Sequence, residues 1–167
     1  MEYCTDIPGK EKIKEEIEAL LKANHFSERR GPYNTRTDYA GDMDVGSYVD
    51  RRYSGKTFRD TLLDFQIEKN ISDPDVYSAA KLDRKHYNKL INNVDTRPTK
   101  ETVEAIGIAL RLTPAEFNIL MSSAGYTLSR SIRRDVIVEY FLLNKIFDID
   151  IINDTLYSFG ERTLSRF

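Results

Sequence analysis

The apolar positions of this 167-residue chain recur at helical spacing in a series of short segments. In residues 10–24, Ile13, Ile17, Leu20 and Leu21 lie three or four positions apart, and charged side chains fill the other faces. From Thr57 onward similar segments follow closely, and none alternates convincingly as a strand would. The pattern predicts an all-α fold with helices at about 10–24, 57–67, 72–81, 83–92, 99–110, 113–125, 129–144 and 150–158.

Residues with short polar side chains mark where these helices begin. A Ser, Thr or Asp oxygen can accept a hydrogen bond from a free backbone N–H of the first turn, and proline is tolerated there. We therefore expect helices to begin after Thr57, Ser72, Asp83, Thr99 and Thr113, with Pro74 and Pro114 in first turns and Gly125 at one end. The expected inward residues are Phe58, Leu62, Phe65, Ile67, Val103, Ile106 and Leu110.

The composition changes between the first helix and Lys56. Residues 25–55 are rich in Gly, Arg, Asp, Thr and Tyr and have almost no aliphatic residues, so they cannot bury enough apolar surface to fold alone. The chain therefore divides into 1–56, a helix with a linker or tail, and 57–167, a helical module. The tail is either a solvated tether or a peptide that docks on a protein partner through Tyr33, Tyr39, Tyr48 and Tyr53.

Composition and charge place the chain in a broad class. No stretch approaches the roughly 20 apolar residues that span a membrane, and the N-terminus lacks the pattern of a signal peptide. The single cysteine, Cys4, rules out an internal disulfide framework, so a cytoplasmic location is expected. A net charge of −2 and a pI near 5.8 give no global attraction to nucleic acid, so any basic surface must be local.

Residues Thr61 to Leu120 resemble the Xre/Cro-like helix-turn-helix family along their whole length. The most specific part is the run TVEAIGIALRLTPAEFNIL, with an apolar helix, a short turn containing leucine and a final amphipathic helix. The resemblance implies five packed helices, with 72–81 as the positioning helix and 83–92 as the recognition helix. The other matching residues are Leu62, Ile71, Ser72, Val76, Ala79, Leu82, Tyr87, Leu90 and Pro98.

A second resemblance extends to the C-terminus. The segments KLDRKHYNKLI, RPTKETV, SAGYTLS and IVEYFL are similar to the helical C-terminal module of some bacterial macro-domain proteins, which process ADP-ribose. Here the module stands without a macro domain. Because the likeness continues through the last two helices, we expect them to belong to the same compact unit as the helix-turn-helix.

The local charge around the recognition helix favours double-stranded DNA as a partner. Residues 81–100 contain six basic and two acidic residues. If Leu82, Tyr87 and Leu90 point inward, one surface carries side-chain types that read guanine and adenine edges or contact phosphates. The predicted DNA-binding residues are Arg84, Lys85, Asn88, Lys89, Arg97 and Lys100.

Three acidic residues near the same edge argue for a different partner. In the Xre family the first turn of the positioning helix usually offers glutamine to a phosphate, whereas this chain has Asp73, Pro74 and Asp75, and Asp83 follows. Carboxylates there would repel a phosphate, unless they serve only as caps and first-turn charges. The first interpretation is a bacterial transcription regulator; the alternative is an adaptor that binds a protein through its tail or this acidic edge.

The predicted helix 129–144 is apolar around more of its circumference than a one-sided surface helix requires. We expect Ile132, Val136, Tyr140 and Leu143 on one face, and Ile151, Ile152, Leu156 and Phe159 inward in the last helix. The helix is either sandwiched between the five-helix core and the last helix, or part of it forms a homodimer interface. A dimer would suit DNA with two half-sites.

No arrangement of residues suggests catalysis, a metal or a cofactor, so the chain is predicted not to be an enzyme. His25 and His86 are far apart, and neither they nor Cys4 shows metal-ligand spacing. No serine or cysteine has a base nearby in a known motif, and no glycine-rich phosphate loop follows a strand. Residues 41–44 look faintly like a calcium loop, but the remaining ligand spacing fails. His86 is expected on the surface.

Overall fold

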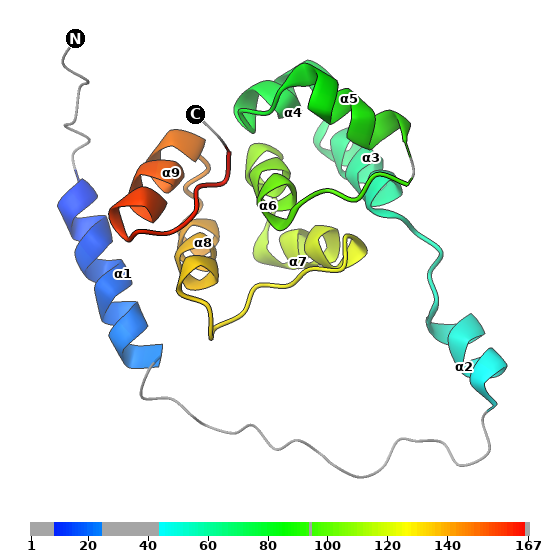
Figure 1. The fold of residues 1–167 in the computed structure, drawn as a ribbon, viewed down its shortest axis with the longest axis horizontal. Coiled ribbons are helices and arrows are strands. Elements are labelled where there is room, and N and C mark those ends of the chain that lie inside the picture. The colour runs from blue at the N-terminus through cyan, green and yellow to red at the C-terminus, as the bar shows by residue number, and fades with distance from the viewer. Residues whose placement is uncertain (1–8, 25–43, 94, 166–167) are drawn as a thin grey trace.

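The computed structural model describes residues 9–24, 44–93 and 95–165. These residues form helices and connecting loops without a strand, which confirms the all-α prediction for this part of the chain. Figure 1 shows α3 to α9 gathered into one body with α1 beside it, whereas α2 stands away. The helices are α1 Lys10–Asn24, α2 Val45–Arg52, α3 Phe58–Lys69, α4 Asp73–Ala79, α5 Arg84–Asn92, α6 Lys100–Ala109, α7 Pro114–Ser123, α8 Arg133–Leu143 and α9 Ile149–Ser158.

Five of the predicted helix starts are confirmed by hydrogen bonds. In α3 and α7 the cap is reciprocal, because Asp60 and Glu116 also accept a bond from the backbone N–H of the capping threonine. Gly125 has a left-handed φ of 79° just after α7, which ends that helix as predicted. The five capping side chains that accept a hydrogen bond from the first turn of their helix are Thr57, Ser72, Asp83, Thr99 and Thr113.

Helix α6 lies at the centre of the module and packs against α4, α7 and α9. Every residue from Thr102 to Ile108 is buried, including the predicted Val103 and Ile106. Gly107 faces α7: a Cβ atom at this position would lie 2.6 Å from two ring carbons of Phe117. The missing side chain therefore lets the Phe117 ring lie directly against the α6 backbone.

Helix α8 is sandwiched, as one of the two interpretations of its apolar sequence expected. It packs against α1, α7 and α9, and its residues 134–138 and 140–142 are buried. The helix starts later than predicted, because Asp135 accepts a hydrogen bond from the Ser129 backbone N–H at 2.8 Å and holds the preceding residues in a turn. The apolar face predicted for this helix is covered only in its middle: Val136 and Tyr140 are buried, whereas Ile132 and Leu143 are 48% and 63% exposed. No helix in the described ranges has the length and apolarity needed to cross a membrane.

The N-terminal helix α1, predicted from its spacing at 10–24, joins the core of the module. Ile17 is fully buried within the hydrophobic core. The Tyr140 hydroxyl on α8 donates a hydrogen bond to the Glu16 carboxylate at 2.6 Å. Burial, together with this carboxylate, raises the pKa of Tyr140 to about 12. Amphipathic spacing indicated a helix here, but not that its apolar face would close over α8.

Two expectations for the segments around Lys56 need correction. Part of the predicted linker forms α2, which Asp44 caps by accepting a hydrogen bond from Ser47, although none of the helix's residues is buried. Ile67, expected to point inward, is 79% exposed because it lies on the outer face of α3. Residues 25–43, including Tyr33 and Tyr39, lie outside the described residues.

Charged side chains are buried between α6 and α8. Glu104 on α6 has no solvent exposure and pairs with the Arg134 guanidinium on α8 at 2.6 Å. Asp135, also buried, pairs with Lys100 at 2.6 Å. Arg134 further donates to the Arg162 backbone oxygen at 2.9 Å, which attaches the C-terminal segment. Burial raises the pKa of Glu104, although the guanidinium opposes this shift. These contacts join α6, α8 and the C-terminal segment.

Replacing Gly107 with alanine is expected to lower the free energy of unfolding by about 1–2 kcal/mol. The added methyl group must displace the buried Phe117 ring, which outweighs the better helix propensity of alanine. Urea unfolding followed by circular dichroism measures the effect, and Ser122→Ala on the exposed face of α7 is the control. Wild-type stability in Gly107→Ala would show that the ring can move away at no cost.

Replacing Arg134 with methionine is expected to lower the free energy of unfolding by about 3–5 kcal/mol, because Glu104 then has no buried counter-charge. The double variant Arg134→Met with Glu104→Leu should recover most of this loss, since neither charge remains in the core. The same urea unfolding experiment measures the free energy of unfolding of both single variants, Arg134→Met and Glu104→Leu, and of the double variant. A double variant as unstable as the sum of the two single variants would refute the coupling.

Candidate nucleic-acid interface

Helices α4 and α5 form a two-helix unit joined by a tight turn. Lys81 takes a left-handed φ of 54° and the Leu82 N–H donates to the Tyr77 oxygen at 2.9 Å, which reverses the chain. Asp83 then accepts hydrogen bonds from two backbone N–H groups of the first turn of α5. The Tyr77 and Tyr87 rings lie 5.8 Å apart between the helices. The orientation of α5 is therefore fixed at its start and along its inner face.

The inner face of α5 is anchored in the core. Tyr87 and Leu90 are buried, and Leu82 packs partly buried against the same cluster, as predicted. Burial, together with the Asp73 carboxylate 3.5 Å from its hydroxyl, raises the pKa of Tyr87. The hydroxyl therefore remains protonated at neutral pH and can donate to Asp73.

The outer face of α5 presents the predicted polar residues to solvent. Arg84 and Asn88 are four positions apart, as are Lys85 and Lys89, so the four side chains project from one side of the helix. His86 is also exposed, as expected. Arg84, Lys85 and Lys89 form no ion pair with any other residue that the structure describes, so their charges remain available to a ligand.

The remaining predicted cations differ in what they can contact. Arg97, in the segment between α5 and α6, is exposed and has no acidic partner within the described ranges. Lys100 does not belong with this face, because its ammonium group pairs with the buried Asp135. Lys81, counted in the basic run, pairs with Asp150 at 2.8 Å, which raises its pKa. The structure therefore brings Arg84, Lys85, Asn88 and Lys89 together on one face of α5, whereas Lys100 lies elsewhere.

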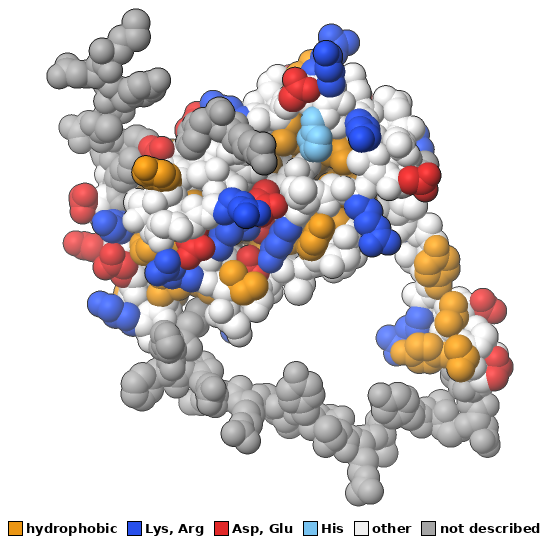
Figure 2. Space-filling view, in the orientation of Figure 1, with side chains coloured by type: hydrophobic (Ala, Val, Ile, Leu, Met, Phe, Trp, Pro, Cys, Tyr) orange, Lys and Arg blue, Asp and Glu red, His pale blue; other side chains and the backbone are white. Residues whose placement is uncertain are grey.

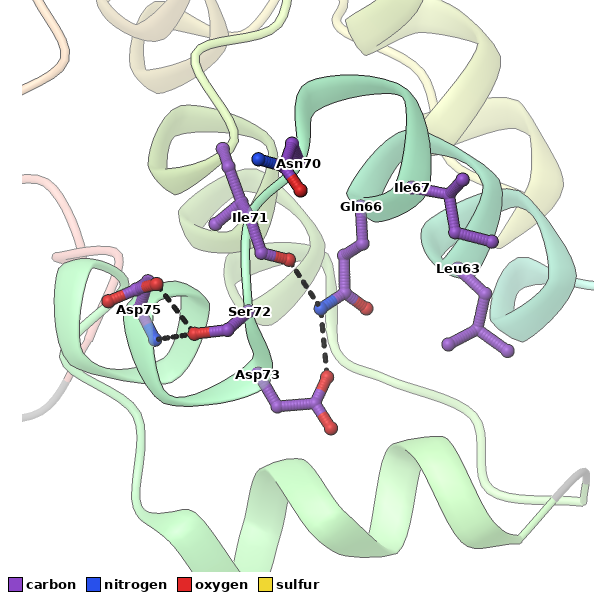
Figure 3. Close-up of a pocket in the computed structure, with 8 residues that line it drawn as sticks. All are labelled: Leu63, Gln66, Ile67, Asn70, Ile71, Ser72, Asp73 and Asp75. Atoms are coloured by element: carbon purple, nitrogen blue, oxygen red, sulfur yellow. Dashed lines mark hydrogen bonds between the residues drawn. The ribbon is translucent and has the colours of Figure 1, made fainter.

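The acidic residues near α4 have structural partners. Figure 3 shows the Asp73 carboxylate accepting a hydrogen bond from the Gln66 amide at 2.8 Å, and Asp75 accepting one from the Ser72 hydroxyl at 2.5 Å. Their charges nonetheless stay at the edge of the two-helix unit. In Figure 2 the basic side chains over α4 and α5 are scattered among acidic and apolar ones. The surface is locally basic on α5 but mixed around it.

A shallow groove of about 440 Å³ lies beside this edge, between the outer face of α3 and the start of α4. The Gln66 side chain borders it (Figure 3), and its Oε1 atom is buried without a hydrogen-bond partner in the described structure. Gln66 was not predicted from the sequence, and the available signal was a glutamine between the apolar residues Phe65 and Ile67. The groove is lined by Leu63, Gln66, Ile67, Asn70, Ile71, Ser72, Asp73 and Asp75.

The described residues offer no metal centre. No group of three or more His, Cys, Asp or Glu side chains within them could hold a metal ion. Cys4, His25 and residues 41–43 of the faint calcium-loop pattern lie outside the described residues. Comparisons of the chain with models of protein families, with curated proteins and with solved structures found no match.

Proposed function

We propose that this protein binds double-stranded DNA through the outer face of α5 and acts as a transcription regulator, on a scaffold of the Xre/Cro-like helix-turn-helix type. The observation that carries the proposal is the division of α5 into two faces. Tyr87 and Leu90 hold one face in the core, while Arg84, Lys85, Asn88 and Lys89 leave the other face polar, basic and free of ion pairs with the residues that the structure describes.

The side chains on this face suit the two tasks of DNA recognition. An arginine can donate two hydrogen bonds to a guanine edge and an asparagine can pair with an adenine edge, so Arg84 and Asn88 are assigned to bases. Lys85 and Lys89 are assigned to phosphates, which fix position without reading sequence. A helix of nine residues is about 14 Å long, and an α-helix fits the roughly 12 Å wide major groove.

The acidic edge restricts how a duplex can approach. Asp73 and Asp75 lie in the first turn of α4, where other helices often bind a phosphate. Since their carboxylates would repel a phosphate, we place the phosphate contacts at Lys85, Lys89 and Arg97 instead. Binding then depends on few cations, so the affinity should be modest for one protomer.

Replacing Arg84 with alanine is expected to weaken binding to a cognate duplex by about 1–3 kcal/mol and to relax specificity at one base pair. Lys89→Ala should weaken binding to all sequences alike and reduce the salt dependence, because only a phosphate contact is lost. Duplexes selected from genomic fragments at low and at physiological salt supply the cognate site. Fluorescence anisotropy then measures the affinities.

The matched control is Arg111→Ala, because Arg111 is exposed in the turn after α6, on a different part of the chain. It should leave DNA affinity unchanged. Selection of no sequence at physiological salt, together with equal binding by wild type, Arg84→Ala and Lys89→Ala, would overturn the proposed interface.

The alternative function is a protein-binding adaptor on the same scaffold. The observation that favours it is the exposed helix α2 together with the acidic edge at Asp73 and Asp75, which offers apolar and charged groups that DNA would not use. A protein partner whose binding is lost on changes to that edge, and not on Arg84→Ala, would support the adaptor over DNA recognition.

A further inference from the structure

The groove beside α3 has the chemistry of a site for an arginine carried on an apolar helix. The outer face of α3 contributes Leu63 and Ile67, and Ile67 is an exposed apolar side chain that no other described residue covers. Next to it are the Asp73 carboxylate and the Gln66 Oε1 atom, an acceptor that is buried and unpaired in the described structure. Figure 3 shows Leu63 and Ile67 on one side of Gln66 and Asp73 on the other. A guanidinium with neighbouring apolar groups would complement both halves.

Helix α2 carries such a group of side chains. Val45, Tyr48, Val49 and Arg52 are spaced three or four positions apart and share one face. The Arg52 guanidinium lies 5.6 Å from the centre of the Tyr48 ring, so the charge emerges from the apolar face itself. None of the residues of α2 is buried, and Val45 is 78% exposed. The face is complete but has no partner within the described residues.

We propose that α2 docks in the α3–α4 groove of a second copy of this chain, which forms a reciprocal homodimer. The Val49 and Tyr48 side chains cover Leu63 and Ile67, and the Arg52 guanidinium donates to the Asp73 carboxylate and to Gln66 Oε1. At each of the two contacts of the dimer, an apolar surface thus covers an apolar surface and a positive charge meets a negative one. The observations that support this dimer do not rest on DNA binding by α5.

The connection to α3 disfavours the same contact within one chain. Thr57 caps α3, and Lys56 forms an ion pair with Asp64, so only residues 53–55 connect α2 to the fixed start of α3. An antiparallel return along α3 would place Arg52 near the start of α3, about 12 Å before Gln66. If residues 53–55 were fully extended alongside α3, Arg52 could come closer to Gln66. Tyr48 and Val49 precede Arg52 in the chain, however, and would then lie beyond Leu63 and Ile67 rather than on them. The α2 helix of a second copy is not limited by this short connection and can reach the groove in either orientation.

The test is sedimentation velocity of the full chain over a range of concentrations, without DNA. We expect reversible dimerisation that weakens about tenfold or more in Val49→Glu, Ile67→Glu and Arg52→Glu, because each puts a charge against an apolar or acidic surface. All three residues lie outside the core, so the fold should persist, and circular dichroism checks this.

Two controls match these changes. Arg51→Glu reverses the neighbouring charge on another side of α2, and Ile119→Glu places a carboxylate at an exposed isoleucine of α7; both should dimerise nearly as wild type. A mixture of Val49→Glu and Ile67→Glu chains should associate more strongly than either alone, since one intact α2 and one intact groove remain. A chain that stays monomeric at every concentration, equal effects of the controls, or no gain on mixing would overturn the proposal.

Discussion

The ion pair of Glu104 with Arg134, and that of Lys100 with Asp135, cross between α6 and α8 where water has little access. Buried charges are costly unless each has a close partner, so these pairs permit few alternative arrangements of the two helices. Because α6 also packs against α4, and α4 against α5, the position of the outer α5 face follows from how α6 is held. The buried charges thus link the C-terminal helices, which carry none of the predicted DNA-binding residues, to the α5 surface, which carries four of them.

The same network decides which cations reach solvent. Residues 81–100 contain six basic and two acidic residues, but the Lys100 ammonium group neutralises a buried carboxylate and Lys81 pairs with Asp150. What remains on α5 is a compact group formed by Arg84, Lys85 and Lys89. With a net charge of −2 over the whole chain, attraction to a polyanion would come from this group and Arg97 rather than from the overall field. The attraction to a polyanion would therefore act over a short range and depend strongly on the orientation of the protein.

Local signals predicted the elements well, and tertiary packing decided the rest. Capping residues such as Thr57 and Asp83 act within four residues of sequence, so the helix starts and the inward turn of Tyr87 could be read directly. The partner of Lys100 could not be predicted in this way, because Asp135 is 35 residues away in the sequence. Nothing local distinguishes an ammonium group that faces inward from one that faces water. The prediction that Ile67 points inward was wrong for a related reason. An apolar residue can lie on either side of a helix, and only the surrounding helices determine which side is buried.

Gln66 connects the two surfaces discussed above. Its amide holds the Asp73 carboxylate, and Asp73 also approaches the hydroxyl of Tyr87, the residue that anchors α5. An arginine in the groove would therefore share an acceptor with the inner face of the helix proposed to read DNA. It would also neutralise one of the carboxylates that would repel a phosphate at the start of α4. The two proposals taken together couple dimer formation and DNA binding through one carboxylate, and the dimer is expected to bind DNA more tightly than the monomer.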